Sequence, residues 1–186
     1  MADRISAGEL ENSVKRYCIT DSLDVAMGAA AKGATIVQIR AKQLSAREQF
    51  ALMKQAMAGA GIPVLVNSRV DIALAAGVRG VHLPAGSISP ATIRSITPRG
   101  FLIGVSCHTE EELVRAEGEG ADFAVFGPVF ETASHPGVAP LGIEALARAT
   151  RRVAMPVYGL GGITEANAPL CIAAGAAGVA GISMFR

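Results

Sequence analysis

Short apolar runs alternate with amphipathic stretches along this chain, and this alternation constrains the fold more than any other feature of the sequence. The apolar runs are rich in β-branched residues and are bordered by Gly, Pro or Asp, which favours strands over buried helices. We expect eight strands, at residues 16–20, 35–40, 63–67, 80–83, 102–106, 122–126, 155–159 and 178–182. The stretches between them predict helices near 22–32, 45–60, 69–76, 89–97, 109–119, 141–150 and 164–175.

Strands that alternate with helices through tight loops predict parallel β/α units. Eight such units, at a spacing of roughly 20 to 25 residues, favour a closed (β/α)8 TIM barrel over an open doubly wound sheet. No GxGxxG follows the first strand, which weakens the open-sheet alternative further. A chain of 186 residues supports one core, so we expect a single domain over 1–186 with minimal loops.

The sequence reaches Arg186 a few residues after the eighth predicted strand, so the predicted barrel lacks its eighth helix. The outer face of strands eight and one would then be apolar and exposed, which predicts that a second subunit covers it. We therefore expect a homodimer. The residues 6–16, ahead of the first strand, could form a short helix that closes the bottom of the barrel or flanks that strand.

Charge and cysteine content exclude several classes of protein. The net charge of +1 gives no electrostatic footprint for nucleic acid or anionic lipid. The three Cys, at 18, 107 and 171, have the spacing of neither a disulfide framework nor a zinc site. No apolar run reaches the ~18 residues that a membrane span needs. We expect a soluble protein of the reducing cytoplasm that binds neither nucleic acid nor membrane.

Polar residues occur where the second and third strands end, which in a barrel of this kind is the catalytic end. Gln38, Arg40 and Lys42 share one strand parity and predict a cationic, inward-facing group that binds substrate. A solvated basic turn is the alternative, although an inward amide such as Gln38 needs partners. Asn67 shares its parity with an apolar neighbour and should point into the mouth, unless it caps the next helix.

The fifth strand brings a hydroxyl and an imidazole to the same face, at Ser106 and His108. Cys107 has the opposite parity, so we expect a core thiol and no Cys–His dyad. His82, in the short fourth strand, is predicted to be a rim residue with satisfied hydrogen bonds and no catalytic role. Thr109 and Glu112, which follow the fifth strand, have the spacing of a capping box.

Glycine-rich backbone follows strands seven and eight, where barrels of this class bind phosphate on exposed amides. The predicted phosphate-binding residues are Gly161, Gly162, Gly181 and Ser183. Plain turns are the alternative. The longest loop, 127–141, follows strand six and predicts a lid or substrate loop. His135 in this loop is a candidate phosphate ligand or general acid/base, or else a solvated histidine.

At these residues the sequence resembles the thiamine phosphate synthase/TenI family of (β/α)8 barrels. The resemblance covers nearly the whole chain, and its motifs occur in order with matched spacing. They are QIRAK at 38–42, VNSRVDIAL at 66–74, GVHLP at 80–84, GVSCHT at 104–109, ADFAVFGPVFET at 121–132, GLGGIT at 159–164 and AGAAGVAGIS at 174–183. The resemblance implies a thiazole phosphate or thiamine phosphate as the small-molecule ligand.

Two activities occur in this family. The synthases join a pyrimidine pyrophosphate to a thiazole phosphate, with Mg²⁺ held by aspartates after strands three and four. This chain carries Ser68 and Ser87 where the synthase pattern has these aspartates. TenI-type proteins bind a carboxylated thiazole phosphate, and some aromatise it by a proton shift. The segments NSRVDIAL, LPAGSISP and FGPVFET resemble this TenI branch.

The chain also departs from the tautomerase pattern, since Pro128 stands where the catalytic histidine of that type is found. We interpret His135 and His108 as the candidate catalytic replacements. A TenI-type thiazole tautomerase without a cofactor is therefore the leading prediction. The alternatives are a thiamine phosphate synthase, for which Mg²⁺ would be needed, and a non-catalytic protein that binds thiazole phosphate.

Overall fold

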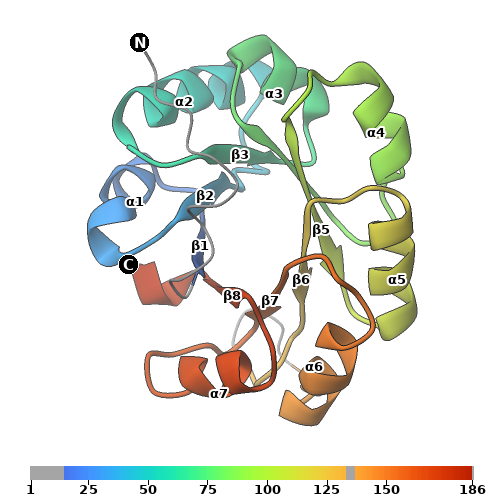
Figure 1. The fold of residues 1–186 in the computed structure, drawn as a ribbon. Helices are drawn as coiled ribbons and strands as arrows, with labels where there is room; N and C mark the ends of the chain where they lie inside the picture. The colour runs from blue at the N-terminus through green and yellow to red at the C-terminus, as the bar shows by residue number, and fades with distance from the viewer. Residues whose placement is uncertain (1–14, 133–136, 186) are drawn as a thin grey trace.

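Eight parallel strands close into a barrel in the order of the sequence, with helices around the outside, in the computed structural model (Figure 1). The structure describes residues 15–132 and 137–185. The strands are β1 (Lys15–Thr20), β2 (Ile36–Ile39), β3 (Val64–Asn67), β4 (Gly80–Leu83), β5 (Leu102–Cys107), β6 (Phe123–Phe126), β7 (Val157–Leu160) and β8 (Gly178–Gly181). Strand β8 pairs with β1 and closes the ring. The predicted TIM barrel is confirmed.

Helices connect the successive strands of the barrel. They are α1 (Leu23–Gly28), followed by the 3-10 helix η2 (Ala30–Lys32), α2 (Ala46–Gly59), α3 (Val70–Ala76), α4 (Pro90–Ile96), α5 (Glu110–Gly118), α6 (Ile143–Thr150) and α7 (Ala168–Ala173). After β8, the described chain forms only the 3-10 helix η3 (Ser183–Phe185), as expected for a barrel without an eighth helix. Helix α7 begins later than predicted because Thr164 and Asn167 close a turn on each other.

Hydroxyl side chains begin several helices, in each case by accepting a hydrogen bond from the backbone N–H three residues further on. These residues are Ser22, Ser45, Ser89 and Thr109. At α2 the capping box is complete, because the Glu48 carboxylate accepts from the Ser45 backbone N–H at 2.8 Å. At α5 the Glu112 carboxylate accepts from the backbone N–H of His108 instead, at 2.6 Å. The capping box predicted at Thr109 is therefore only half formed.

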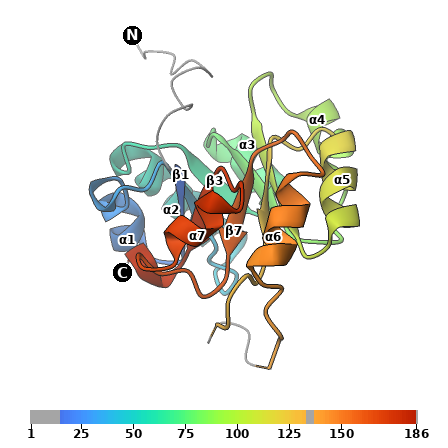
Figure 2. The ribbon, with the colours of Figure 1, turned by 60° about the horizontal axis from the view of Figure 1, so that its bottom comes forward.

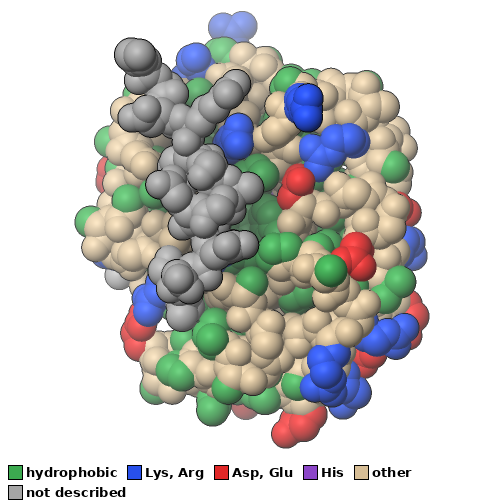
Figure 3. All heavy atoms as spheres, in the orientation of Figure 1, with side chains coloured by type: hydrophobic (Ala, Val, Ile, Leu, Met, Phe, Trp, Pro, Cys, Tyr) green, Lys and Arg blue, Asp and Glu red, His purple; other side chains and the backbone are tan. Residues whose placement is uncertain are grey.

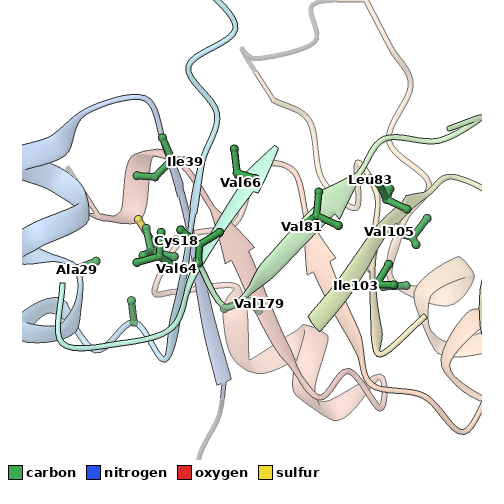
Figure 4. Packing of buried hydrophobic residues seen from close by; sticks show 14 of the residues in the cluster. Cys18, Ala29, Ile39, Val64, Val66, Val81, Leu83, Ile103, Val105 and Val179 are labelled. Atoms are coloured by element: carbon green, nitrogen blue, oxygen red, sulfur yellow. The ribbon is translucent and has the colours of Figure 1, made fainter. Parts of the chain in front are cut away.

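The main hydrophobic core lies between the barrel and the helices. Outward-facing side chains of the strands, among them Val66, Val81 and Ile103, pack there (Figure 4). Cys107 is 1% exposed within this layer, and burial raises the pKa of its thiol to about 12. The predicted core role of Cys107 is confirmed, since a thiol with a raised pKa is a poor nucleophile.

A second, smaller apolar cluster fills the inside of the barrel. Its aromatic rings come from Tyr17, Phe123 and Tyr158, whose centroids lie 5.5 to 6.1 Å apart in edge-on arrangements. Such edge-to-face contacts are the favourable geometry for neighbouring rings. The aromatic cluster therefore fills this part of the interior, and the Tyr17 hydroxyl connects it to the polar side chains of the neighbouring strands.

The outer face of β1 and β8 is covered within the chain itself. Cys18 and Val179, on these strands, are fully buried in the same cluster as Phe185 of η3. The carbonyl of Phe185 accepts a hydrogen bond from Lys32 Nζ at 3.0 Å, which joins η3 to η2. The prediction of an exposed apolar face is therefore wrong, because a short turn suffices to cover a small two-strand surface. A homodimer stays a prediction that no longer has this argument behind it.

The two ends of the barrel carry different segments of the chain. In Figure 2, β1 begins at one end of the barrel, and the described residues 127–132 and 137–142, between β6 and α6, project from the other. Figure 3 shows the end at which the strands begin, and no histidine is visible on the part that grey atoms leave uncovered. The helix predicted within residues 6–16 falls almost wholly outside the described residues. Among the described helices, none is both long and apolar enough to cross a membrane.

Candidate functional site

Six side chains form a continuous line of hydrogen bonds inside the carboxyl end of the barrel. We call this line the polar chain, and its members are Ser68, Asn67, Gln38, Tyr17, His82 and Ser106. They come from β1 to β5 and from the residue that follows β3. Strand parity explains the arrangement, because alternate residues of each strand face the interior.

The middle of the polar chain is buried. The Tyr17 hydroxyl donates to Gln38 Oε1 at 2.9 Å and lies 3.1 Å from His82 Nδ1. Tyr17, Gln38 and His82 are 0%, 2% and 3% exposed, respectively. Among the described residues, no buried side-chain nitrogen or oxygen lacks a hydrogen-bond partner. The polar groups therefore sit in the core without the large penalty of unpaired burial.

Burial dominates the ionisation of His82. Desolvation, with a smaller contribution from the positive charge of Arg40, lowers the pKa of His82 to about 3. The imidazole is thus neutral at any physiological pH and carries one N–H. Burial likewise raises the pKa of the Tyr17 phenol well above its ordinary value. Neither group is suited to exchange charge with solvent.

The two ends of the polar chain are less buried than its middle. Asn67 Nδ2 donates to Ser68 Oγ at 2.9 Å, and both residues line a pocket of about 320 Å³ with Lys42 and Arg69, which we call the Lys42 pocket. At the other end, Ser106 Oγ lies 2.9 Å from His82 Nε2 on the inner face of β5, and Ser106 is partly exposed. A pocket of about 230 Å³ lies outside the barrel, between the loop after β4 and α5.

The sequence prediction for β2 and β3 is confirmed in its geometry. Gln38 Nε2 donates to Asn67 Oδ1 at 3.0 Å, so the two amides meet inside the mouth as their parity indicated. Asn67 does not cap α3, whose N-cap residue is Arg69, without a side-chain hydrogen bond. Arg40 and Lys42 follow the end of β2 and are exposed at the rim. Their binding of substrate stays a prediction.

Ser106 and His108 do not form the pair that strand parity suggested. The histidine bonded to Ser106 is His82. His108 lies beyond the end of β5, where its Nδ1 is 2.6 Å from the carbonyl oxygen of Gly127. Strand parity placed the two side chains on one face, but β5 ends at Cys107 and α5 begins at Glu110, so the alternation does not fix the direction of the His108 side chain. His82 also lies deeper than a rim residue, although its hydrogen bonds are satisfied as predicted.

The glycines after β7 are required by a close approach of two loops. Gly161 and Gly162 have φ angles of 98° and 63°, which residues with a side chain rarely adopt. A Cβ on Gly161 would lie 2.6 Å from the Cα of Pro128, and one on Gly162 would lie 2.3 Å from the carbonyl oxygen of Glu131. Backbone hydrogen bonds from Val129 to Leu160 and from Phe130 to Gly161 fasten the two loops together.

This close approach leaves the glycine amides available. Within the described chain, the backbone N–H groups of Gly161 and Gly162 donate no hydrogen bond. Gly181 is buried at the end of β8, and Ser183 is exposed at the start of η3. Open amides in a left-handed conformation are the backbone arrangement that receives anions. Phosphate binding by these four residues stays a prediction.

The loop after β6 is anchored at both of its described flanks. Val129 is 1% exposed, and Leu141 and Gly142 return to bond with Pro128 and Val129 at 2.8 and 3.1 Å. His135 lies outside the described residues, so its role as ligand or catalyst stays a prediction. Pro128 itself packs against Gly161, which gives this residue a structural role in the site.

The residues at the ends of β3 and β4 do not fit a magnesium site. Ser68 Oγ already accepts a hydrogen bond from Asn67, and the nearby Asp71 carboxylate is held by Arg69 at 2.5 and 2.9 Å. In the described ranges, no three of the residue types His, Cys, Asp and Glu gather as metal ligands would. Neutral hydroxyls are poor ligands for a hard dication that prefers carboxylate oxygens.

Sequence reasoning missed Tyr17 and undervalued His82. A signal for Tyr17 was present, because this tyrosine shares the inward parity of Ile19 in a strand that must fill a barrel. His82 has glycine neighbours in space, and a Cβ on Gly104 would lie 2.8 Å from its Nδ1. An imidazole beside a glycine of the neighbouring strand indicates a side chain accommodated inside the barrel.

Comparison with known proteins identifies the family. The family model described as thiamine monophosphate synthase (TMP-TENI) matches residues 14–185. The chain belongs to this family. It is 42% identical over 179 residues to the thiamine-phosphate synthase of Methanoculleus marisnigri, covering 90% of this chain and 85% of that protein. It is 40% identical over 164 residues to that of Methanocella arvoryzae, covering 86% of this chain and 77% of that protein.

Among solved structures, the thiamine phosphate pyrophosphorylase from Pyrococcus furiosus is similar over 95% of this chain and 90% of its own, with a TM-score of 0.83 and 32% identity. Membership of this family places the chain among proteins of thiamine biosynthesis. The names of these relatives are those of the synthase activity and not of the TenI-type tautomerase.

Proposed function

We propose that this chain binds a thiazole phosphate at the carboxyl end of its barrel and acts as a TenI-type thiazole tautomerase. The observation that carries the proposal is the presence of Ser68 and Ser87 where the synthase pattern has metal-binding aspartates. Departure of pyrophosphate needs its developing charge neutralised, whereas a proton shift within one substrate creates no such leaving group. The rim of this barrel suits the second kind of reaction.

The reaction is a proton shift within one substrate, and it conserves atoms and electrons. A base takes the C2 proton of the carboxythiazoline phosphate, and the electron pair of that C–H bond enters the aromatising ring. The exocyclic double bond then receives a proton at its carbon. We assign the base to His108, whose Nδ1 donates to the carbonyl of Gly127 at 2.6 Å. A neutral imidazole that donates through Nδ1 has an unprotonated Nε2, which can accept a proton.

The phosphate and carboxylate of the substrate need separate anion sites. We place the phosphate at the open amides of Gly161 and Gly162, with Gly181 and Ser183 beside them, since these segments follow β7 and β8. We place the carboxylate near Arg40 and Lys42, across the mouth. Asn67 and Ser106 are partly exposed and would bind the substrate directly, whereas Gln38 is buried and would act by orienting Asn67. His135 is the second candidate for proton transfer.

A thiamine phosphate synthase is the second candidate function, and the names of the relatives favour it. In that case the chain would join the pyrimidine and thiazole halves without the aspartates that its relatives' pattern supplies. The same ligand class would bind in either case. A homodimer, a cytoplasmic location and a tautomerase without a cofactor are further predictions of the proposal.

One assay separates these functions. Purified protein is incubated with the carboxythiazoline phosphate, and aromatisation is followed by absorbance in EDTA. A parallel reaction contains the pyrimidine pyrophosphate, thiazole phosphate and Mg²⁺, and thiamine phosphate is measured. We expect aromatisation that does not depend on Mg²⁺, and a rate lowered about 100-fold or more in His108→Ala.

The matched control is Glu111→Ala, an exposed change on α5 close to His108 that touches no site residue. A robust Mg²⁺-dependent yield of thiamine phosphate would establish the synthase and refute the tautomerase. Thermal stabilisation by thiazole phosphate with neither product would indicate a binding protein without turnover.

A further inference from the structure

The hydrogen bonds of the polar chain have a direction that follows from counting protons. Gln38 Nε2 donates to Asn67 Oδ1, and Asn67 Nδ2 donates to Ser68 Oγ. At the centre, the Tyr17 hydroxyl donates to Gln38 Oε1. A phenol has a single hydrogen, so this bond uses the only proton that Tyr17 offers.

The remaining two bonds are then determined. The Tyr17 oxygen, 3.1 Å from His82 Nδ1, can only accept, so Nδ1 must carry the imidazole hydrogen. Because the buried His82 is neutral, its Nε2 has no hydrogen and must accept. The Ser106 hydroxyl, 2.9 Å from Nε2, is therefore the donor of that bond. All five bonds point from the Ser106 end towards the Ser68 end.

The consequence lies at Ser106, which is partly exposed inside the carboxyl end of the barrel. A serine hydroxyl has one hydrogen and two lone pairs, and here the hydrogen is already donated to His82. Ser106 thus offers only lone pairs to a ligand that enters the mouth of the barrel. At the opposite end, Ser68 Oγ accepts from Asn67 and keeps its own hydrogen to donate into the Lys42 pocket.

We propose that Tyr17 and His82 are positioning residues that hold the Ser106 hydroxyl as a hydrogen-bond acceptor towards the mouth of the barrel, so that this position selects a ligand N–H or O–H group. Burial makes this polarity stable, because reversing one bond would leave two donors or two acceptors face to face in a water-free interior. A ligand that needed a hydrogen-bond donor at Ser106 would have to reverse all five hydrogen bonds of the polar chain.

Nuclear magnetic resonance of protein labelled with ¹⁵N-histidine tests the inference directly. The nitrogen shifts and long-range couplings of an imidazole report which ring nitrogen is protonated. We expect His82 to be the Nδ1–H tautomer in the wild-type protein, with its signals assigned by their loss in His82→Gln. A wild-type His82 protonated on Nε2 would overturn the proposal, since Ser106 would then be an acceptor inward and a donor outward.

Three variants show which residue sets the tautomer. In Tyr17→Phe the acceptor at Nδ1 is gone, so we expect the proton to move to Nε2, where Ser106 can accept it. Ser106→Ala leaves Tyr17 in place and should keep Nδ1–H. Tyr158→Phe removes a hydroxyl from a ring 6.1 Å from Tyr17 that takes no part in the polar chain, and should also keep Nδ1–H. An unchanged tautomer in folded Tyr17→Phe would contradict the role given to Tyr17.

The inference rests on the proposed function only in taking the mouth of the barrel as the ligand site. The tautomer is measured without any ligand, and the wild-type spectrum decides it even if Tyr17→Phe fails to fold. A protein that bound no thiazole phosphate would refute the proposed function and leave this result standing. An Nε2–H tautomer with normal thiazole phosphate binding would refute this inference alone.

Discussion

The two halves of the barrel mouth offer different kinds of polar group to a ligand. Strands β1 to β5 contribute side chains, which form the polar chain and satisfy one another. Strands β6 to β8 face the interior with apolar groups such as Val125, Leu160 and Ile182. On that side, apart from the Tyr158 hydroxyl, the polar groups assigned to ligand binding are backbone amides, those of Gly161 and Gly162 in a left-handed conformation.

The polar groups of the two halves are held in position by different interactions. Side chains in the first half are held by hydrogen bonds to one another, so their arrangement depends on protonation and on each partner being present. The amides in the second half are held by the packing of two loops, so their arrangement depends on shape. Titration and loss of a hydroxyl should therefore affect the first half, and added volume should affect the second.

Lowering the pH should produce the largest effect on the stability of the protein. It should act through the half formed by β1 to β5. The pKa of His82 is about 3 in the folded protein, against an ordinary value of 6.5, so the unfolded state binds a proton that the folded state does not. Stability is then lost as the pH falls below 6.5, by about 1.4 kcal/mol per pH unit, and no pH dependence arises from this group above that value.

Urea unfolding of wild type and His82→Gln at several pH values measures this contribution. The wild-type protein should lose about 4 kcal/mol relative to the variant between pH 6.5 and pH 3.5. Other titrating groups are common to both proteins and cancel in the difference. Parallel stability curves would mean that His82 is protonated in the folded state, and would contradict its burial as a neutral group.

A side chain added in the half formed by β6 to β8 should have the next largest effect on stability. Gly161→Ala places a Cβ at a φ of 98° and 2.6 Å from Pro128, which should lower the free energy of unfolding by about 2 to 4 kcal/mol. Gly120→Ala is the control, because Gly120 has a φ of 82° but nothing within 4 Å of a Cβ. The control should lose only about 1 kcal/mol. Equal losses would show that the two loops do not confine Gly161.

Loss of one hydroxyl from the polar chain should have a smaller effect. Tyr17→Phe leaves Gln38 Oε1 without its donor, which should cost about 1 to 3 kcal/mol of stability in urea unfolding. Tyr158→Phe, in the same aromatic cluster, removes a hydroxyl outside the polar chain and should cost less. If both variants were equally stable, the hydrogen bonds of the polar chain would add little to the fold.

The smallest effect is expected where the two halves meet, at the seam of β8 and β1. Arg16 on β1 pairs with Glu165 ahead of α7 through two hydrogen bonds of 2.6 Å. The Glu165 side chain is 65% exposed, so solvent and salt screen the pair. Glu165→Gln should change the melting temperature least of the variants, and the difference should vanish in 1 M NaCl. A larger fall in melting temperature that persisted in 1 M NaCl would show that this ion pair helps to close the barrel.

Much of the fold was predictable because it depends on local patterns. The period-two alternation of β2 and β3 placed Gln38 and Asn67 on one face, and their hydrogen bond confirms it. Ser45 and Ser89 began helices where their spacing indicated. The seam of β8 and β1 was mispredicted because three residues after β8 could not be recognised as a cover until Phe185 was seen in the core.

The site was less predictable because its contacts join distant strands. Ser106 has the correct parity for the interior, but parity cannot say which of two histidines is its partner. That choice depends on where β5 ends and on the stagger between β4 and β5, which sets His82 beside Gly104. Similarly, Gly161 and Gly162 are typical of any turn until Pro128 is found against them.

The sequence by itself determined the barrel, the family and the serines at the rim where the resemblance to the synthases implies carboxylates, since periodicity and residue type are local properties that need no neighbours. The tertiary structure alone decided that five strands share one line of hydrogen bonds and that this line has a direction. The physical reason is that a proton on Tyr17 can be donated only once, and which atoms compete for it is known only when the strands are brought together.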